Sequence, residues 1–231
     1  MKLSRLFSPP PFDARHYKRT YIACPPDEAP ATEIIEGALA FARKTLTVDI
    51  DDVCRRMPPA AWRPEVWPGE HYRLLAGIVA ELQPKTVVEI GTHTGLSALA
   101  LLKYLPPAGR LVTFDLIPWD QISGTCLRSG DFAPERFAQE IADLANPAVF
   151  TRHAALLSAA DLIFVDGPKD KKFEPALAAL LDTLSFAQPP WVVFDDSYDL
   201  NMLRFWRELK KPKLDITSLG HWTGTGMVRW N

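Results

Sequence analysis

One stretch of the sequence constrains the fold more than any other. Residues 86–102 read TVVEIGTHTGLSALALL, a short apolar run that reaches Gly91 and Gly95 and continues as a segment rich in alanine and leucine. This order predicts a strand, a tight loop and a helix. The first turn of a helix presents unpaired backbone N–H groups and the positive end of the helix dipole, and glycine lets the backbone approach a ligand closely. We therefore expect a ligand at this loop.

The residues around the loop indicate what kind of ligand it holds. Asp115 closes the next apolar run, residues 111–114, and a carboxylate at that place can accept both hydroxyl protons of a ribose. The dinucleotide fingerprint G-x-G-x-x-G is not satisfied because His93 occupies its middle position, which disfavours a pyrophosphate. Glu89, just before the loop, would repel a phosphate but suits a cationic ligand. A nucleoside-bearing, positively charged cofactor fits best, and an NAD-linked oxidoreductase is a distant alternative.

The segment EIGTHTGLSA, residues 89–98, resembles the first motif of class I S-adenosylmethionine-dependent methyltransferases, in which an acid stands two residues before the glycine loop. A bulky residue in place of the central glycine, followed by Ser97, is most similar to the catechol and caffeoyl-CoA O-methyltransferase branch. The resemblance implies that S-adenosyl-L-methionine is the cofactor. The residues it assigns to the cofactor are Glu89, Gly91, Thr92, His93, Gly95, Ser97, Asp115 and Asp166.

Acidic residues also stand at the ends of two later apolar runs. Asp166 follows LIFV, and Asp195 and Asp196 follow WVVF. The carboxyl ends of parallel strands share one edge of a sheet, so these three carboxylates are expected to converge beside the glycine loop. Hard oxygen ligands suit Mg²⁺ or Ca²⁺ far better than zinc, and a divalent cation at Asp166, Asp195 and Asp196 is therefore predicted. The alternative is that each aspartate caps a helix or turn.

Lys169 lies three residues beyond Asp166 on the same expected loop. A lysine beside metal-bound oxygen and a cationic sulfonium is expected to have a lowered pKa and to take a proton from an acceptor hydroxyl. The metal-dependent branch of the family has Asp, two intervening residues, Lys and Asp, a pattern present here from Asp166 to Asp170, and a second motif of Asp followed by Asn or Asp. The resemblance thus implies that Asp166, Asp195 and Asp196 are metal ligands and Lys169 is the general base.

Apolar periodicity outlines the remaining elements. It predicts strands over 148–151, 162–165, 191–194, 214–218 and 227–230, and helices over 32–46 with Thr32 as N-cap, 51–57, 70–82, 133–144, 173–184 and 200–209. The short spacing between the first two of these strands predicts that the helix normally found between them is almost absent. Alternating strands and helices indicate a mainly parallel sheet covered on both faces. With the resemblance, we expect an α/β fold: a doubly wound, seven-stranded Rossmann-like sheet with an antiparallel C-terminal strand and an N-terminal helical cap.

Length and composition indicate how the chain is divided. The 231 residues, 47% of them hydrophobic, suffice for one sizeable α/β domain with an appendage. We predict a Pro-rich N-terminal arm and helical cap over residues 1–69 and an S-adenosylmethionine-binding domain over residues 70–231. The arm suggests a homodimer. The loop before residue 70 carries Trp62 and Trp67, which are expected either to pack on the core or to form a lid.

Charge and cysteine content exclude several classes. The formal net charge is -2 with acids and bases mixed along the chain, so neither nucleic acid nor an anionic membrane is an expected partner. The three cysteines lack C-x-x-C spacing, which argues against a disulfide framework or structural zinc. Neither a signal peptide nor a membrane-spanning run is predicted, so a cytoplasmic location is expected.

These observations predict an O-methyltransferase that transfers a methyl group to a hydroxyl of a small molecule, with a divalent metal such as Mg²⁺ assisting. A vicinal diol would chelate such a metal, so the expected acceptor is a catechol-like aromatic or a sugar diol. His221 and Trp222 either face that acceptor or pack against the protein. The alternatives are a sugar or macrolide-type O-methyltransferase and a non-catalytic module that only binds S-adenosylmethionine.

Overall fold

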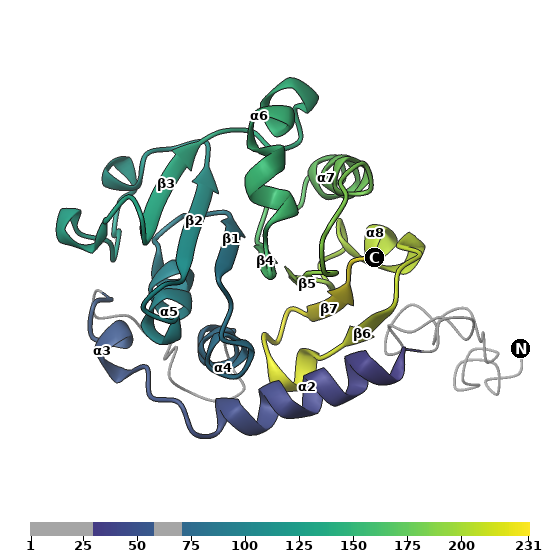
Figure 1. Cartoon of the computed structure of the whole chain (residues 1–231), viewed down its shortest axis with the longest axis horizontal. Coiled ribbons are helices and arrows are strands. Elements are labelled where there is room, and N and C mark those ends of the chain that lie inside the picture. The colour runs from purple at the N-terminus through teal and green to yellow at the C-terminus, as the bar shows by residue number, and fades with distance from the viewer. Residues whose placement is uncertain (1–29, 58–70) are drawn as a thin grey trace, which may run out of the picture.

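The computed structural model describes residues 30–57 and 71–231, which form a twisted seven-stranded sheet with helices on both faces (Figure 1). The predicted N-terminal arm, the loop with Trp62 and Trp67, and the boundary at residue 69 lie outside these residues. No helix in the described ranges is long and apolar enough to cross a membrane. The strands are β1 (Thr86–Ile90), β2 (Arg110–Asp115), β3 (Phe137–Ile141), β4 (Leu162–Val165), β5 (Trp191–Asp195), β6 (Lys213–Asp215) and β7 (Thr225–Arg229).

The strand order is β3-β2-β1-β4-β5-β7-β6. Strands β1 to β5 pair in parallel, and β7 runs antiparallel between β5 and β6. The order reverses at β1, where the chain crosses from one half of the sheet to the other, and ligands of doubly wound sheets bind at such a point. The predicted Rossmann-like fold with an antiparallel C-terminal strand is confirmed.

Two helical layers cover the sheet. The helices are α2 (Thr32–Thr45), α3 (Asp51–Cys54), α4 (Tyr72–Leu82), α5 (Leu96–Tyr104), α6 (Pro147–Ser158), α7 (Phe173–Leu181) and α8 (Leu203–Glu208). Helices α2, α4 and α5 lie on one face of the sheet and α6, α7 and α8 on the other (Figure 1). Short 3₁₀ turns occur at η2 (Trp119–Gln121), η3 (Ser129–Asp131) and η4 (Thr217–Leu219).

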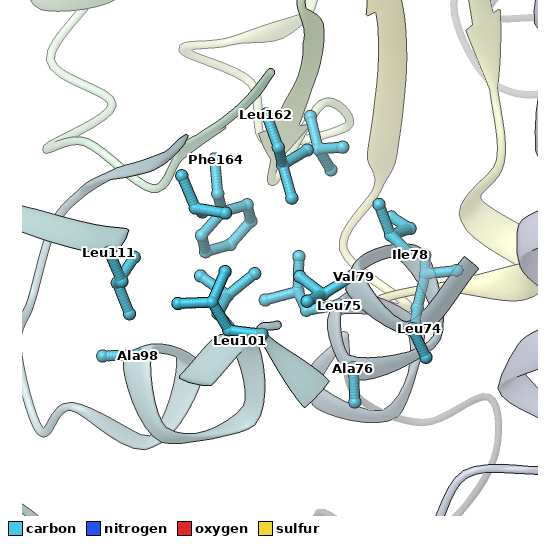
Figure 2. Packing of buried hydrophobic residues seen from close by; sticks show 14 of the residues in the cluster. Leu74, Leu75, Ala76, Ile78, Val79, Ala98, Leu101, Leu111, Leu162 and Phe164 are labelled. Carbon is cyan, nitrogen blue, oxygen red and sulfur yellow. The ribbon is translucent and has the colours of Figure 1, made fainter. Parts of the chain in front are cut away.

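Strand side chains alternate between two hydrophobic cores, as the pleat requires. In β1, Val87 belongs to the core beneath α4 and α5, whereas Val88 and Ile90 belong to the core beneath α6 and α7. Figure 2 shows the first core, where leucine, isoleucine and valine side chains of α4 and α5 meet Leu111 of β2 and Phe164 of β4. Glu89 is two residues from Val87 on the same strand, so its side chain points to the same face and this core.

Two neighbouring predictions of secondary structure are wrong. Residues 133–144 do not form a helix, because Phe137–Ile141 is strand β3 and pairs in parallel with β2. Residues 148–151 are not a strand but lie inside α6, whose N-cap Asn146 accepts hydrogen bonds from the backbone N–H groups of Ala148 and Val149. The helix expected to be almost absent is therefore present, with Pro147 at its first position, where proline is favoured.

The N-terminal helix α2 packs along α4 and belongs to the same core. Phe41 meets the ring of Trp191 edge-on, with ring centroids 5.2 Å apart. The helix begins at Thr32, but its N-cap is Ala31 and makes no side-chain capping bond, so the predicted cap at Thr32 is wrong. Helix α2 also contacts β6 and β7.

Candidate active site

Three aspartates converge at the carboxyl ends of β4 and β5. Asp166 and Asp195 follow the paired residues Val165 and Phe194, so they emerge side by side from adjacent parallel strands. Asp196 comes next and adopts a left-handed backbone conformation, with φ of 57°. Carboxylate oxygens of the three residues all lie within 4.8 Å of one another. The convergence predicted from the strand ends is therefore present.

Lys169 reaches back into this cluster. Its Nζ forms an ion pair with Asp166 and lies 3.2 Å from Oδ2 of Asp196. Its backbone N–H donates to Oε1 of the buried Glu174, 3.1 Å away, which fixes the loop between β4 and α7. Burial alone would lower the pKa of Lys169, but the charges of Asp166 and Asp195 raise it above its ordinary value. The lowered pKa expected from the sequence is not found, because the carboxylates hold the ammonium form.

Two histidines lie on the other side of Asp195. Nδ1 of His221, in the loop before β7, is 3.0 Å from Oδ1 of Asp195, and Nδ1 of His71, just before α4, is 3.4 Å from the same oxygen. Burial opposes ionisation of Asp195, but the charge of His71 and the hydrogen bond with His221 hold its pKa below its usual range. Trp222, the neighbour of His221, is 72% exposed, so it does not pack in the core.

A pocket of about 680 Å³ opens beside the aspartates, over the ends of β1, β2 and β4. Four of the predicted cofactor residues line it: Gly91, His93, Asp115 and Asp166. Its walls are largely apolar and come from Ile90, Phe114, Leu116, Ile117, Ala142, Phe173 and Ala176. Asp166 belongs both to this pocket and to the carboxylate cluster, so the two sites are continuous.

The glycine loop at the pocket needs both of its glycines. Gly91 has φ of 102°, and a Cβ there would lie 2.1 Å from the backbone oxygen of Asp166. Gly95 has φ of 77°, and a Cβ there would lie 2.2 Å from the side chain of Leu127. Asp115 ties the loop to β2, since its carboxylate accepts the backbone N–H of His93 at 2.8 Å and that of Leu116 at 2.7 Å.

The other predicted cofactor residues lie beneath the loop and do not line the pocket. Glu89 is fully buried and accepts a hydrogen bond from Thr113, whose hydroxyl also contacts that of Thr92. Burial raises the pKa of Glu89 to about 7, although hydrogen bonds from Ser97 and Thr113 oppose the shift. Gly95 begins α5 and Ser97 lies in its first turn. These residues support the loop, and direct contact of Glu89, Thr92, Gly95 and Ser97 with a cofactor stays a prediction.

Sequence reasoning missed two groups of residues at the site. Ala142 and Asp143, which line the pocket, follow β3, and the helix predicted over 133–144 concealed that they stand at a strand end. The sequence places His71 only in the helix predicted over residues 70–82, because Asp195, which it contacts, is far away in sequence. The Asn-Pro pair before α6 was the signal that would have placed Ala142 and Asp143 correctly.

Comparison with known proteins agrees with this geometry. Residues 88–197 match a family model described as a methyltransferase domain. A segment of 45 residues, 20% of the chain, is 40% identical to catechol O-methyltransferase B from Danio rerio, and it spans only 17% of that protein.

Solved structures are similar over nearly the whole chain. An SAH-bound methyltransferase from Podospora anserina has a TM-score of 0.51 at 16% identity, with 97% of this chain and 99% of that chain covered. A methyltransferase from Geobacter sulfurreducens has a TM-score of 0.52 at 14% identity, covering 95% of this chain and 98% of that chain. At such identities the likeness concerns the fold. The sheet order and the two solved structures show that the chain has the fold of these methyltransferases, and the match to the methyltransferase-domain model covers just under half of the chain.

Proposed function

We propose that the protein is an S-adenosylmethionine-dependent O-methyltransferase that acts on a hydroxyl of a small molecule. The observation that carries the proposal is the position of Asp166, which lines the pocket over β1, β2 and β4 and also belongs to the cluster with Asp195, Asp196 and Lys169. A methyl donor in the pocket would thus lie next to groups able to bind and deprotonate an acceptor. A module that only binds the cofactor has no need of that cluster.

The pocket has the features that an adenosyl cofactor requires. The carboxylate of Asp115 borders it and can accept ribose hydroxyl protons, while apolar side chains from three elements offer a surface for the base. The backbone at Gly91 can approach the cofactor closely because no side chain stands there. The negative charge of Asp166 favours the cationic sulfonium and amino groups of the methyl donor over a neutral nucleoside.

Lys169 is the proposed general base. Its Nζ is held between Asp166 and Asp196, and only 12% of its side chain is exposed, so it acts from a fixed position. To accept a proton it must first lose its own, which the two carboxylates oppose as long as their charge is not otherwise balanced. Its position next to the pocket shortens the path that an acceptor proton must travel.

The carboxylates of Asp166, Asp195 and Asp196 fit a hard divalent cation such as Mg²⁺, because all three offer oxygen donors within 4.8 Å of one another. When bound, such a cation would act as a Lewis acid that lowers the pKa of an acceptor hydroxyl. The aspartates themselves orient the acceptor relative to the pocket. Methyl displacement needs the acceptor oxygen, methyl carbon and sulfur in line, so positioning can supply up to about 7 to 11 kcal/mol of the barrier reduction.

A diol is the acceptor class we propose, because two adjacent oxygens chelate a divalent cation. The relative that is 40% identical over 45 residues is named as a catechol O-methyltransferase. Catechol-like aromatics and sugar diols are both candidates. Sugar or macrolide-type acceptors would need the same cluster with a wider entrance. An acceptor screen with one methyl donor separates these possibilities.

The experiment that tests the proposal is calorimetric titration of the full chain with S-adenosylhomocysteine, with NAD as the control ligand. We expect saturable binding of S-adenosylhomocysteine and none of NAD. Methyl transfer from S-adenosylmethionine to catechol and to sugar diols, with and without Mg²⁺, is then followed by mass spectrometry. Absence of S-adenosylhomocysteine binding would overturn the proposal, and binding without transfer to any hydroxyl would reduce the protein to a cofactor-binding module.

A further inference from the structure

Behind the carboxylate cluster lies an imidazole that no packing argument explains. His71 is 3% exposed; its Nδ1 lies within ion-pair distance of Asp195, and its Nε2 has no hydrogen-bond partner in the part of the chain that the structure describes. A neutral imidazole has one N–H donor and one acceptor nitrogen, and each buried group left unpaired costs about 1 to 3 kcal/mol. Purely hydrophobic packing between Phe164 and Tyr72 would be served better by leucine or phenylalanine.

The ring of His71 lies close to two further groups that can donate electron pairs to a metal ion, the carboxylate of Asp195 and the imidazole of His221. His71 Nδ1 lies 3.4 Å from Oδ1 of Asp195, and His221 Nδ1 lies 3.0 Å from the same oxygen. The two imidazole rings are 5.2 Å apart and nearly perpendicular. One donor atom from each of His71, Asp195 and His221 lies within 4.8 Å of the others.

These separations match those of ligands that share one metal ion. Donor atoms bound about 2.1 Å from an ion lie about 3.0 to 3.4 Å apart when the coordination angle is about 90° to 110°. The oxygen–nitrogen distances at Asp195 fall at the two ends of this range. A cation between the rings would therefore replace the protons that the imidazoles share with the carboxylate, without a large movement of His71 or His221.

On the opposite side of the cluster from the histidines, Lys169 already supplies a positive charge. Lys169 pairs with both Asp166 and Asp196, so two of the three carboxylates have a counter-charge supplied by the chain. The donors on the imidazole side are a mixed nitrogen and oxygen set. Such a set suits zinc, cobalt, iron or manganese, whereas magnesium prefers oxygen ligands in an octahedral arrangement and gives up its water reluctantly.

We propose that His71, Asp195 and His221 form a binding site for a divalent transition-metal ion, distinct in its donor set from a cage of three carboxylates. Asp195 belongs to both sets of donors. The inference therefore specifies which ion would assist methyl transfer. It rests on the proposed function only for that role of the ion. Cation binding itself is independent of methyl transfer. The site consists of two imidazoles and one carboxylate.

The test is calorimetric titration of the chelator-treated full chain with CoCl₂, ZnCl₂, MnCl₂ and MgCl₂. We expect Co²⁺ and Zn²⁺ to bind about 100-fold or more tightly than Mg²⁺, with Mn²⁺ between them. The visible absorption of bound Co²⁺ gives a second readout, because its bands report nitrogen ligation. Titration with S-adenosylhomocysteine on the same sample shows separately whether the cofactor site is intact.

Four variants make the assignment specific. His71→Phe and His221→Gln should each weaken Co²⁺ binding by about 100-fold and change its absorption, whereas Asp166→Asn should retain both. His153→Gln is the matched control, since that histidine packs against Phe114 on the other face of the sheet. S-adenosylhomocysteine binding to His71→Phe and His221→Gln shows that each variant is folded, so that lost Co²⁺ binding is not lost folding.

Other outcomes would overturn the proposal. If Mg²⁺ binds as tightly as Co²⁺ and Asp166→Asn abolishes binding of both, the ion belongs to the three carboxylates. If no cation binds while S-adenosylhomocysteine does, Asp195 is simply paired with protonated imidazoles, and the proposed methyltransferase function survives without this metal site. If S-adenosylhomocysteine fails to bind and Co²⁺ still binds through His71 and His221, the metal site stands and the proposed function falls.

Discussion

The hydroxyl of Thr113 donates a 2.5 Å hydrogen bond to Oε2 of Glu89, and neither side chain is exposed to solvent. The two residues are register partners on β1 and β2, so the bond joins adjacent strands directly beneath the glycine loop. A carboxyl group in this position is poorly solvated when ionised. Burial raises its pKa to about 7, and the stability of the unliganded fold is therefore linked to pH.

Glu89→Gln should remove this pH dependence. Because the folded-state pKa lies above the unfolded value, the contribution of Glu89 is fully present below about pH 4.5 and is lost as pH rises through about 7. The difference in unfolding free energy between the wild type and the variant should shift by about 2 to 3 kcal/mol between pH 5 and 8, in favour of the variant at pH 8. Urea unfolding at several pH values measures it. Glu81→Gln, at an exposed position of α4, is the control, and parallel profiles for wild type and Glu89→Gln would contradict the argument.

Lys169→Arg separates the charge of Lys169 from its proposed role as a base. Arginine keeps a positive charge beside Asp166 and Asp196 but does not give up its proton at any working pH. We expect methyl transfer to fall by about 100-fold or more, with S-adenosylhomocysteine affinity within about threefold of the wild type. Kinetics and calorimetry on the same preparations check this, and Lys171→Arg, which also replaces a lysine of positive φ on this loop, is the control. Full turnover in Lys169→Arg would mean that another group removes the proton.

The sheet and the acidic edge could be predicted because their signals are local. Buried parallel strands show as short, continuous apolar runs with a polar residue near the end. Four such runs are strands of the sheet, and they end at Glu89-Ile90, Asp115, Asp166 and Asp195. Once the strands are known to be parallel, topology alone brings their carboxyl ends together. The convergence of Asp166 with Asp195 needed no further information.

The errors arose where the local signal is ambiguous. Phe137 and Ile141 are four residues apart and satisfy a helical pattern, yet only Phe137 is buried, because β3 is an edge strand with one neighbour. Conversely, α6 buries only Phe150 and Leu157, too few to show a clear stripe. His71 could not be connected with Asp195 and His221 from sequence, since that contact depends on how α4 and the loop before β7 meet above β5.

Gly91→Ala should damage the site more than its backbone angle alone explains. Gly91 and Gly124 both have positive φ, 102° and 76°, but a Cβ at Gly91 would overlap the backbone of Asp166, whereas one at Gly124 would meet nothing within 4 Å. Gly124→Ala should therefore cost about 1 kcal/mol of stability, and Gly91→Ala at least about 3 kcal/mol, with loss of S-adenosylhomocysteine binding. Chemical unfolding and calorimetry of the two variants decide the point, and equal losses would show that the approach of Asp166 to the loop is not tight.

Lys213→Met should destabilise the C-terminal part of the sheet. Lys213, on β6, is 2% exposed, and its Nζ donates hydrogen bonds to the backbone carbonyls of Trp206 and Leu209, at the end of α8. The last carbonyls of a helix have no partner within the helix and carry the negative end of its dipole, so a buried ammonium both satisfies and balances them. Methionine fills the same space without donating. We expect a loss of about 3 kcal/mol in unfolding free energy, measured by urea denaturation.

The matched variant for this prediction is Lys210→Met, at an exposed position of the same segment. A surface lysine contributes about 0 to 1 kcal/mol, so the two variants should differ by about 2 kcal/mol or more. Among the described residues β6 pairs with β7 alone, and Thr225 of β7 is the register partner of Asp195 on β5. Weakening the end of α8 should therefore also loosen the strand beside the carboxylate cluster. Hydrogen exchange of the β7 amides should therefore accelerate in Lys213→Met and not in Lys210→Met. Unchanged β7 exchange together with a full loss of stability would show that α8 and the active-site edge unfold independently.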